Sequence, residues 1–307
     1  MPKTAFLFPG QGSQKPGMGR ELAEHFDAAR RIFEQADAAL GFPISQLCFE
    51  GPEESLKLTE NTQPAILTCS VAALAVLREK GLQPDYVAGH SLGEYSALVA
   101  AGALSFPDAV RLVRQRGRYM QEAVPDGLGA MAALLGLDCK KLQEICRKAA
   151  EGEVVSPANL NSPGQVVIAG HRAAVGRAVE LAKQAGARKA VLLQVSAPFH
   201  CALMQPAAEQ LAHDLDGVAI QDLQVPLVNN VAAQEVRTAE DAREGLKRQV
   251  VNPVLWEESM RLLAARGVER FVEAGPGKVL TGLLRNIDRS LSGANVEDLA
   301  SLEKLFA

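Results

Sequence analysis

The stretch Asp85-Tyr86-Val87-Ala88-Gly89-His90-Ser91-Leu92-Gly93-Glu94 decides the fold class of this chain. Residues 85–88 favour a short strand, residues 89–93 form a glycine-flanked turn, and residues 94–101 favour a helix. A serine on a tight turn between a strand and a helix is a nucleophile elbow, in which bulky flanking side chains would clash. The helix N-terminus then offers unpaired N–H groups beside Ser91, which favour a negatively charged oxygen. Because the five-residue pattern is short, the interpretation depends on strand, turn and helix appearing in this order.

The first half of the chain alternates short apolar strands with helices. Residues 5–8 favour a strand that enters the loop 9–13, helices follow to about residue 40, and a longer helix is expected over residues 63–80. Short apolar strands that each lead into a helix indicate a parallel sheet covered on both faces. Ligands gather at the carboxyl ends of such strands, where Gln11 and Ser91 both lie.

Residues 128–197 have a different pattern, with elements in the order βαββαβ. The predicted strands are 129–135, from 154 onward, 165–169 and 190–195, and the helices are 139–150 and 173–186. This order is that of a ferredoxin-like unit, and the turn 161–164 joins two strands directly, so the sheet should be antiparallel. We therefore predict an inserted subdomain within an α/β core of residues 1–127 and 198–307. The core should resume with strands near 226–228 and 269–272 and a closing helix from about 278.

Composition narrows the class of protein. The chain has 307 residues, 48% of them hydrophobic and 22% charged, which predicts an ordinary globular protein. A net charge of −4 with scattered lysines and arginines gives no reason to expect nucleic-acid binding. No apolar run reaches the ~18 residues that span a membrane, and residues 1–4 run into a strand without a signal peptide. Five cysteines without close pairs favour a reducing compartment, so we expect a cytoplasmic protein.

A serine nucleophile requires a base, and histidine is the usual one. The histidines of the chain are His25, His90, His171, His200 and His213. His90 lies inside the turn, where neighbouring side chains point in different directions, and three others lie in or at the start of helical stretches. His200 follows a strand at the boundary between the two parts, a cleft position, so it is either the base or a structural residue. Cys201 beside it is a competing nucleophile, and no aspartate is clearly placed to orient His200.

The predicted helix 106–124 carries an arginine on its apolar side. Ser105 and Asp108 begin the helix with a capping box. An apolar stripe follows at about 100° per residue, made of Ala109, Leu112, Val113, Met120 and Val124. Arg116 lies inside this stripe, whereas the other arginines of the helix, Arg111, Arg114 and Arg118, lie on the opposite face. A guanidinium taken out of water needs an acidic partner, which is either a substrate carboxylate or a protein carboxylate such as Glu94.

Several motifs together resemble the malonyl-CoA:acyl carrier protein transacylase family. They cover nearly the whole chain in the family's order and separation, and jointly they are far more specific than any one alone. The motifs are Phe8-Pro9-Gly10-Gln11-Gly12-Ser13-Gln14, Gly89-His90-Ser91-Leu92-Gly93-Glu94-Tyr95, Arg116-Gly117, Asn161-Ser162-Pro163-Gly164-Gln165, Phe199-His200, Gln249 with Asn252-Pro253-Val254 and Trp256, and Glu273-Ala274-Gly275-Pro276-Gly277. The resemblance implies an α/β-hydrolase-like core with a parallel sheet and a ferredoxin-like insertion, in agreement with the predicted division.

The resemblance also implies roles for catalytic residues. Ser91 matches the nucleophile that takes the acyl group, and His200 matches the base that activates it. Gln249 matches the residue whose backbone carbonyl orients that imidazole, which explains the missing aspartate. The backbone N–H groups of Gln11 and Leu92 match the oxyanion hole.

Four further positions are expected to bind substrate. Arg116 matches the residue that grips the free carboxylate of malonate, which favours the substrate as its acidic partner. Phe199 resembles the malonyl-type rather than the methylmalonyl-type pattern of the family. Met120 and Asn161 complete this set.

The implied activity is transfer of a malonyl group from malonyl-CoA to the phosphopantetheine thiol of holo-acyl carrier protein. It would proceed through a malonyl-serine intermediate with ping-pong kinetics and supply fatty acid biosynthesis. No metal or other cofactor is expected, since no ligand spacing suggests one and the loop 12–17 lacks the Lys-Ser/Thr of a phosphate-binding loop. We expect a monomer with a basic rim for the acidic carrier. The candidate rim residues are Arg177, Lys183, Arg188, Lys189, Lys278 and Arg285.

Other classes of protein would share part of this pattern. A serine esterase or thioesterase would use the same elbow, but would lack Arg116 in the stripe and would normally supply an acid between the serine and the histidine. A related acyltransferase would differ in its acyl preference. A non-catalytic carrier-binding protein would have no use for Ser91 and His200 together.

Overall fold

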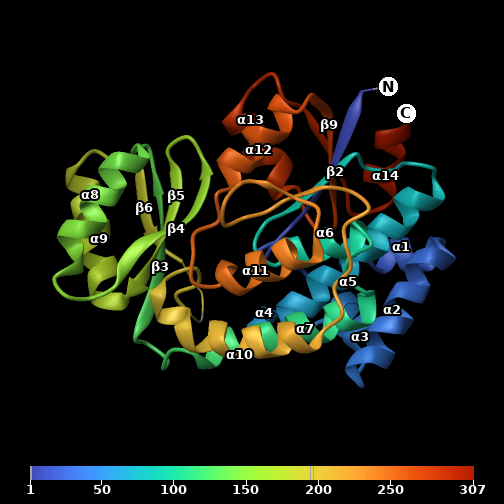
Figure 1. The fold of residues 1–307 in the computed structure, drawn as a ribbon, viewed down its shortest axis with the longest axis horizontal. Helices are drawn as coiled ribbons and strands as arrows, with labels where there is room; N and C mark the ends of the chain where they lie inside the picture. Colours follow the sequence, from blue (N-terminus) through green and yellow to red (C-terminus); the bar gives the residue numbers. More distant parts are fainter. Residues whose placement is uncertain (1, 194, 196) are drawn as a thin grey trace.

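The computed structural model describes residues 2–193, 195 and 197–307, which form two separate sheets (Figure 1). The larger sheet has the strand order β10-β9-β1-β2-β7-β8. Its strands are β1 Lys3–Phe8, β2 Tyr86–Gly89, β7 Leu227–Val228, β8 Glu235–Val236, β9 Val268–Ala274 and β10 Gly293–Val296. All neighbouring strands are parallel except β7 and β8. The prediction of an α/β core with a parallel sheet is therefore confirmed.

Alternate side chains of β1 enter two different cores, one on each face of the sheet. Phe6 and Phe8 belong to the larger core, together with buried residues of α5 (Thr59–Glu79) and α7 (Phe106–Glu122). Ala5 and Leu7 belong to a second core, together with residues of α12 (Trp256–Ala265) and α13 (Val279–Ile287). This two-residue alternation is the pattern of a strand that is buried on both sides.

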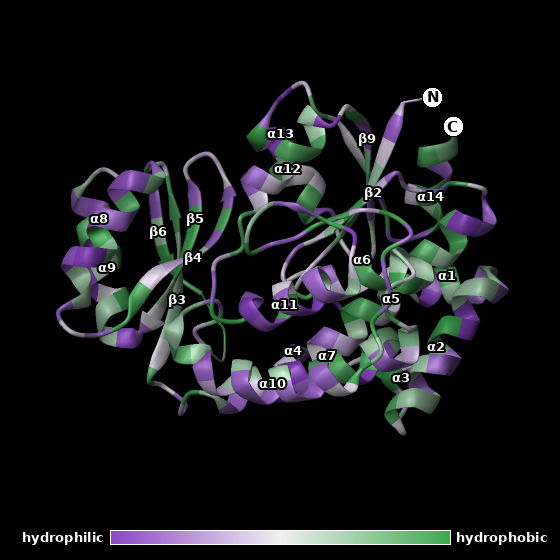
Figure 2. Ribbon diagram, viewed as in Figure 1, coloured by the Kyte–Doolittle hydropathy of each residue, from purple (hydrophilic) through white to green (hydrophobic). Residues whose placement is uncertain are grey.

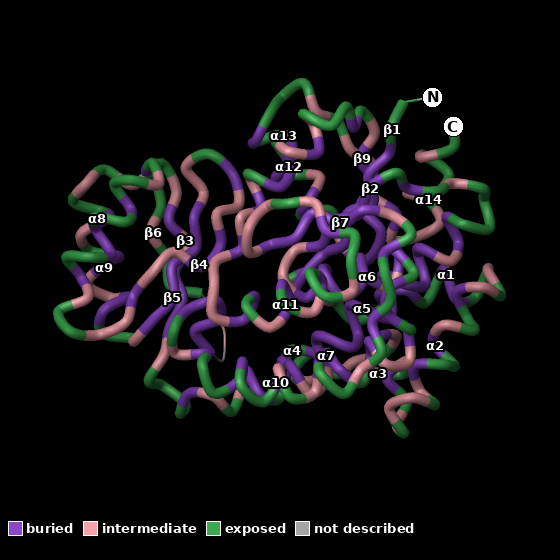
Figure 3. The backbone as a smooth tube through the Cα atoms, in the orientation of Figure 1, coloured by how far each residue is buried: buried purple, intermediate pink, exposed green. Residues whose placement is uncertain are grey.

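The remaining helices of this part surround the sheet. Figure 3 shows the buried backbone concentrated along the central strands and α5, with exposed turns at the rim. These helices are α1 Arg20–His25, α2 Asp27–Leu40, α3 Ile44–Glu50, α4 Glu53–Lys57, α6 Gly93–Ala100, α10 Gln205–Gly217, α11 Ala239–Gln249 and α14 Leu299–Phe306, with a short 3₁₀ helix, η1 Ala202–Met204.

The smaller sheet is antiparallel, with the strand order β4-β5-β3-β6. Its elements are β3 Gly129–Leu135, α8 Cys139–Ala150, β4 Val155–Ser162, β5 Gln165–His171, α9 Arg172–Gln184 and β6 Lys189–Leu192. Ala132 and Leu134 of β3 pack in a separate core with residues of α8 and α9. Both helices lie on the outer side of this sheet, where their exposed faces are hydrophilic (Figure 2). The predicted antiparallel unit is confirmed.

The inner face of the smaller sheet contacts the larger part of the molecule. Met131 and Val167 belong to the larger core, although they lie on β3 and β5. The segment 252–254 also pairs with β4, since Leu160 N donates to Val254 O at 2.9 Å and Val254 N donates to Ala158 O at 2.9 Å. Residues from both sheets can therefore meet in one site.

Several predicted boundaries differ from those in the structure. Helix α5 begins at Thr59, four residues before the expected start, and Pro64 lies inside it; proline favours a first helical turn, which displaced the prediction. Strand β6 ends at Leu192, whereas the prediction ran to residue 195 and included residue 194, which lies outside the described residues. Helix α13 does not close the chain, because β10 and α14 follow it. The Gly293–Val296 strand is a short, half-buried edge that lacks the strong apolar pattern of its neighbours.

Candidate active site

Ser91 lies on a strained turn at the carboxyl end of β2. Its φ angle is 51°, in the left-handed region that residues with a side chain rarely adopt. Only glycine fits at the two flanking positions, because the backbone packs too closely there for a Cβ atom. A Cβ atom on Gly89 would lie 1.9 Å from the carbonyl oxygen of Gly93, and one on Gly93 would lie 2.0 Å from that of Phe8. The turn thus matches the geometry expected of an elbow, and α6 begins directly after it at Gly93.

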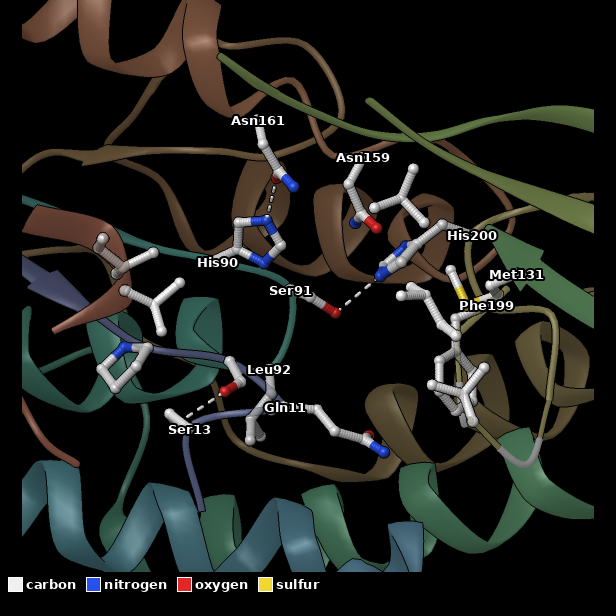
Figure 4. Close-up of a pocket in the computed structure, with 18 of the residues that line it drawn as sticks. Gln11, Ser13, His90, Ser91, Leu92, Met131, Asn159, Asn161, Phe199 and His200 are labelled. Atoms are coloured by element: carbon white, nitrogen blue, oxygen red, sulfur yellow. Dashed lines mark hydrogen bonds between the residues drawn. The ribbon is translucent and has the colours of Figure 1, made fainter. Parts of the chain in front are cut away.

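His200 lies at hydrogen-bond distance from the Ser91 hydroxyl. The Nε2 atom of His200 is 2.7 Å from Ser91 Oγ (Figure 4). On the other side of the ring, Nδ1 is 3.0 Å from the carbonyl oxygen of Gln249 and 3.2 Å from that of Asn252. Two carbonyl acceptors require the proton on Nδ1, so Nε2 is the acceptor for the serine proton. Two backbone carbonyls thus orient the imidazole in place of a carboxylate.

Burial keeps His200 neutral. The residue is buried, and this burial together with the positive charge of Arg116 lowers the pKa of His200 to about 3. A neutral imidazole is the form that accepts a proton, so His200 is in its basic form at every pH above that value. Like Ser91, His200 has a left-handed backbone, with a φ angle of 61°. Strain at both residues is typical of a functional site held by its surroundings.

The other candidate groups point elsewhere. The His90 ring turns away from Ser91, with Nε2 2.9 Å from Asn161 Oδ1. His171 accepts a hydrogen bond from Val154 N at 2.9 Å within the smaller unit. The thiol of Cys201 donates to Pro198 O at 3.1 Å, and burial raises the pKa of Cys201 to about 11. A buried, protonated thiol is a poor nucleophile, so Cys201 does not compete with Ser91.

Arg116 extends from the apolar stripe of α7 to the Ser91 hydroxyl. The side chain is 1% exposed. Its Nη2 atom donates to Ser91 Oγ at 3.1 Å and to Gln249 Oε1 at 2.9 Å, and Nη1 donates to Gln63 Oε1 at 2.8 Å. Within the described residues no carboxylate forms an ion pair with Arg116, which excludes the direct pair with Glu94 considered from the sequence. Neutral amide oxygens bind two of its three nitrogens without cancelling its charge.

A polar network behind Ser91 holds these groups together. Of its members, Gln63 and Asn230 were not predicted from the sequence, and Glu94 was considered only as an ion-pair partner of Arg116. Asn230 Oδ1 accepts a hydrogen bond from Ser91 N at 2.7 Å, and Gln249 Nε2 donates to Ser91 O at 3.0 Å. A signal was present for Glu94, because it is a charged residue in the otherwise mostly apolar helix α6, and buried polar groups are normally hydrogen-bonded.

Gln11 and Leu92 line the site from two neighbouring loops. Gln11 follows β1 and Leu92 follows Ser91, and both line the same cavity. The two loops are packed closely, since a Cβ atom on Gly10 would lie 2.5 Å from the carbonyl oxygen of His90. In the part of the chain that the structure describes, neither amide N–H donates to another protein group. Such free, adjacent donors can bind a negatively charged oxygen.

The cavity itself lies between the two sheets and has a volume of about 250 Å³. The larger part supplies Ser91, Arg116 and Met120, and the smaller part supplies Met131 and Val167. Asn159, Asn161 and Phe199 are among its other lining residues. Met120 is 2% exposed, and its Sδ atom is 3.6 Å from Gln63 Nε2. All nine residues singled out from the sequence therefore lie in or directly behind one cavity.

Neither a metal centre nor a membrane span is evident over residues 2–193, 195 and 197–307. No group of three or more histidine, cysteine, aspartate or glutamate side chains in these ranges could hold a metal ion. None of the helices there is both long enough and apolar enough to cross a bilayer. All five cysteines are free thiols.

A serine on a strand–turn–helix elbow, paired with a neutral histidine, defines the class of enzymes that handle acyl groups through a serine. The acyl transferase domain family matches residues 5–304 of the chain. A relative from Bacillus subtilis, named malonyl CoA-acyl carrier protein transacylase, is 53% identical over 99% of this chain and 96% of its own length. The chain therefore belongs to the acyl transferase family, and within it to the malonyl CoA-acyl carrier protein transacylases.

Solved structures agree with this assignment. An acyl carrier protein S-malonyltransferase from Vibrio cholerae has a TM-score of 0.97 and 49% identity, with 99% of each chain covered. A malonyl-transacylase in complex with a type II PKS acyl carrier protein has a TM-score of 0.96 and 50% identity, with 98% of each chain covered. At this similarity the whole fold, including both sheets, is shared.

Proposed function

We propose that this protein transfers the malonyl group of malonyl-CoA to the phosphopantetheine thiol of holo-acyl carrier protein, and so supplies the extender unit for fatty acid biosynthesis. The observation that carries this proposal is the position of Arg116. Its buried guanidinium is 3.1 Å from the Ser91 hydroxyl, is bound by the amide oxygens of Gln63 and Gln249, and forms no ion pair with a carboxylate among the described residues. A cation beside the nucleophile suits an acyl group that ends in a carboxylate. The names of the relatives support the same substrate and partner.

In the first half-reaction, Ser91 takes the acyl group. Its Oγ attacks the thioester carbonyl while the hydroxyl proton moves to His200 Nε2, 2.7 Å away. The carbonyl oxygen becomes negatively charged and is bound by the N–H groups of Gln11 and Leu92. The carbon–sulfur bond then breaks, and His200 returns its proton to the leaving coenzyme A thiolate. A malonyl-serine ester remains.

In the second half-reaction, the carrier thiol reverses these steps. It gives its proton to His200, its sulfur attacks the ester carbonyl, and the bond to Ser91 Oγ breaks as His200 protonates that oxygen. Because coenzyme A leaves before the carrier thiol reacts with the malonyl-serine ester at the same site, the kinetics are ping-pong. The Gln249 carbonyl keeps the Nδ1 proton of His200 in place throughout.

The acyl preference follows from what surrounds Arg116. Gln63 and Gln249 hold the guanidinium through amide oxygens, so its positive charge remains available to the substrate. Malonate would pair with it in a charge-assisted contact, whereas an acetyl group would leave it unmatched. Met120 and Phe199 form apolar walls, and Asn161 holds the His90 ring beside the serine. A plain esterase or thioesterase has no need of this buried cation.

The carrier is expected to dock at a basic rim around the cavity mouth. Arg177 already pairs with Glu153 at 2.7 Å and Lys183 with Glu180 at 2.7 Å, so these two are weaker candidates. The other four candidates, Arg188, Lys189, Lys278 and Arg285, are exposed and form no ion pair within the described ranges. These four positive charges are therefore available to an acidic partner. Transfer to the carrier should then weaken as salt concentration rises.

The proposed organisation of the chain follows the expectation from its sequence. Residues 1–127 and 198–307 form an α/β-hydrolase-like core, and residues 128–197 form a ferredoxin-like subdomain; the strand order β4-β5-β3-β6 supports the second name. Since one chain supplies every polar group of the site, a monomer suffices for activity. The five free thiols support a cytoplasmic location.

One assay tests the proposed function. The protein is incubated with malonyl-CoA labelled in the malonyl group, with and without holo-acyl carrier protein. We expect the label on Ser91 when the carrier is absent and on the carrier thiol when it is present. Release of free malonate at the same rate in both samples would indicate a thioesterase, and no label on protein would indicate a non-catalytic binding protein.

A further inference from the structure

The carboxyl group of Glu94 is buried beside the site, but none of the chemical steps uses it. Glu94 lies in the first turn of α6 and is 2% exposed. Its Oε2 atom accepts hydrogen bonds from the backbone N–H of Asn230 at 2.9 Å and from Gln249 Nε2 at 3.0 Å. A carboxyl group kept in such a place at the cost of desolvation calls for an explanation.

The side chain of Gln249 connects Glu94 to Arg116. Its Nε2 atom faces acceptors only, namely Glu94 Oε2 and Ser91 O at 3.0 Å each and Asn230 Oδ1 at 3.4 Å. Its Oε1 atom faces a donor, Arg116 Nη2, at 2.9 Å. A carboxamide has one donating and one accepting end, so a rotation of this group by half a turn would place N–H groups against the guanidinium.

The position of Arg116 depends on this orientation. The guanidinium is held by Gln63 at Nη1 and by Gln249 and Ser91 at Nη2, and its Nε atom has no hydrogen-bond partner among the described residues. If the Gln249 amide turned, one of the two amide oxygens that hold the cation would be lost. Glu94 Oε2 accepts a hydrogen bond at the far end of the amide, and this contact would be lost if the amide turned.

We propose that Glu94 is a positioning residue for acyl selectivity, which holds the carboxamide of Gln249 in the orientation that keeps the Arg116 guanidinium at Ser91. This inference rests on the proposed function, since it concerns how a malonyl group is preferred over a neutral one. Glu94 does not touch the substrate in this arrangement. It acts through one hydrogen bond to Gln249, so the length of its side chain matters more than its charge.

Two conservative variants separate the effect of side-chain length at position 94 from the effect of charge. Glu94→Asp keeps the charge but shortens the side chain by one methylene, so its carboxylate cannot reach both Asn230 N and Gln249 Nε2. Glu94→Gln keeps the reach and one accepting oxygen but removes the charge. The measurement is the ratio of malonyl-CoA to acetyl-CoA kcat/KM for acylation of Ser91, together with the melting temperature of each variant. Arg116→Ala provides the reference for complete loss of carboxylate recognition.

We expect the malonyl to acetyl ratio of Glu94→Asp to fall by about tenfold, with acetyl kcat/KM within threefold of wild type, whereas Glu94→Gln keeps the wild-type ratio within threefold. The reverse order would assign Glu94 a counter-charge role and overturn the inference. So would an equal loss of both substrates in Glu94→Asp, which indicates a structural role only, or an unchanged or increased ratio in that variant.

Glu273, near the end of β9, offers a matched control. It is also a buried carboxyl, but it accepts hydrogen bonds from Leu280 N at 3.0 Å and Thr281 N at 2.8 Å at the start of α13, and none from Gln249. Glu273→Asp should lower the melting temperature and leave the ratio unchanged. A wild-type protein that transfers no malonyl group would overturn the proposed function, whereas normal wild-type transfer with the wrong order of variants overturns this inference alone.

Discussion

The guanidinium of Arg116 and the imidazole of His200 approach the same oxygen atom. Arg116 Nη2 is 3.1 Å from Ser91 Oγ and His200 Nε2 is 2.7 Å from it. The cation favours negative charge on that oxygen as the proton leaves, and it also lowers the pKa of His200. In the proposed mechanism, a malonyl carboxylate that enters becomes the better partner for the guanidinium. The residue proposed to recognise the substrate therefore contacts the nucleophile before the substrate binds.

Replacement of Ser91 by alanine should abolish the covalent malonyl-enzyme. Ser91 Oγ is the hydroxyl that His200 and Arg116 both contact, and Cys201 is held as a protonated, buried thiol. Intact-protein mass spectrometry after incubation with malonyl-CoA would measure the adduct, with Cys201→Ala as the control that should still be labelled. An adduct of normal yield on Ser91→Ala would show that another group is the nucleophile.

Replacement of His200 by alanine should slow both half-reactions by about a hundredfold or more, since a positioned general base contributes on this order. Single-turnover acylation by malonyl-CoA and deacylation by the carrier thiol measure the two steps separately. A comparison with Asn252→Ala is informative, because the backbone carbonyl that contacts Nδ1 remains in that variant. If only one step slowed in His200→Ala, a second base would have to serve the other.

The acid limb of Ser91 acylation should lie far below the ordinary range for histidine. Because the pKa of His200 is about 3, lowering the pH from 7.5 to 5 should leave kcat/KM for acetyl-CoA nearly constant. A solvated histidine with a pKa near 6.5 would lose about thirtyfold over this interval. The neutral acetyl substrate is chosen so that recognition of a carboxylate does not contribute. A limb near pH 6.5 would mean that His200 is solvated in the working enzyme.

Glu94 should make the stability of the fold depend on pH. Burial raises its pKa from 4.5 to about 7. As the pH rises, the unfolded chain therefore loses this proton at a lower pH than the folded chain does. The folded state binds more protons than the unfolded one in this window, and the free energy of unfolding therefore decreases as pH rises. Glu94→Gln does not titrate. Its stability relative to wild type should increase by about 2 kcal/mol between pH 5 and 8, measured by urea unfolding. A difference that is independent of pH would mean that Glu94 keeps one protonation state on folding.

Local sequence patterns predicted the elements that position the site. The period of α7 placed Arg116 among apolar residues, and the glycines around Ser91 indicated the elbow, because each depends on neighbours within a few positions. The boundaries of β3 and α8 agree with the prediction to the residue. Weak, short edges such as β8 and β10 escaped prediction, since they are set by pairing with distant strands rather than by their own composition.

The polar network behind Ser91 could not be derived from spacing. Gln249, Asn230 and Glu94 are more than a hundred positions apart at their extremes, and no period relates them. Their contacts exist only because the segment after β7 and the end of α11 are packed against the elbow. A polar residue within an apolar helix marks that a buried partner is needed, but the partner itself is a property of the tertiary fold.

The most direct test compares malonyl-CoA with acetyl-CoA in wild type and in Arg116→Ala. Arg116 is 1% exposed and has no carboxylate partner in the described residues, so a malonyl carboxylate would match its charge and an acetyl group would not. Removal of one partner of such a pair should weaken malonyl transfer by ~2–5 kcal/mol, while acetyl transfer is spared or improved. The ratio of malonyl to acetyl kcat/KM should therefore fall by a factor of about thirty or more. An unchanged ratio would mean that Arg116 is structural and that the carboxylate is recognised elsewhere.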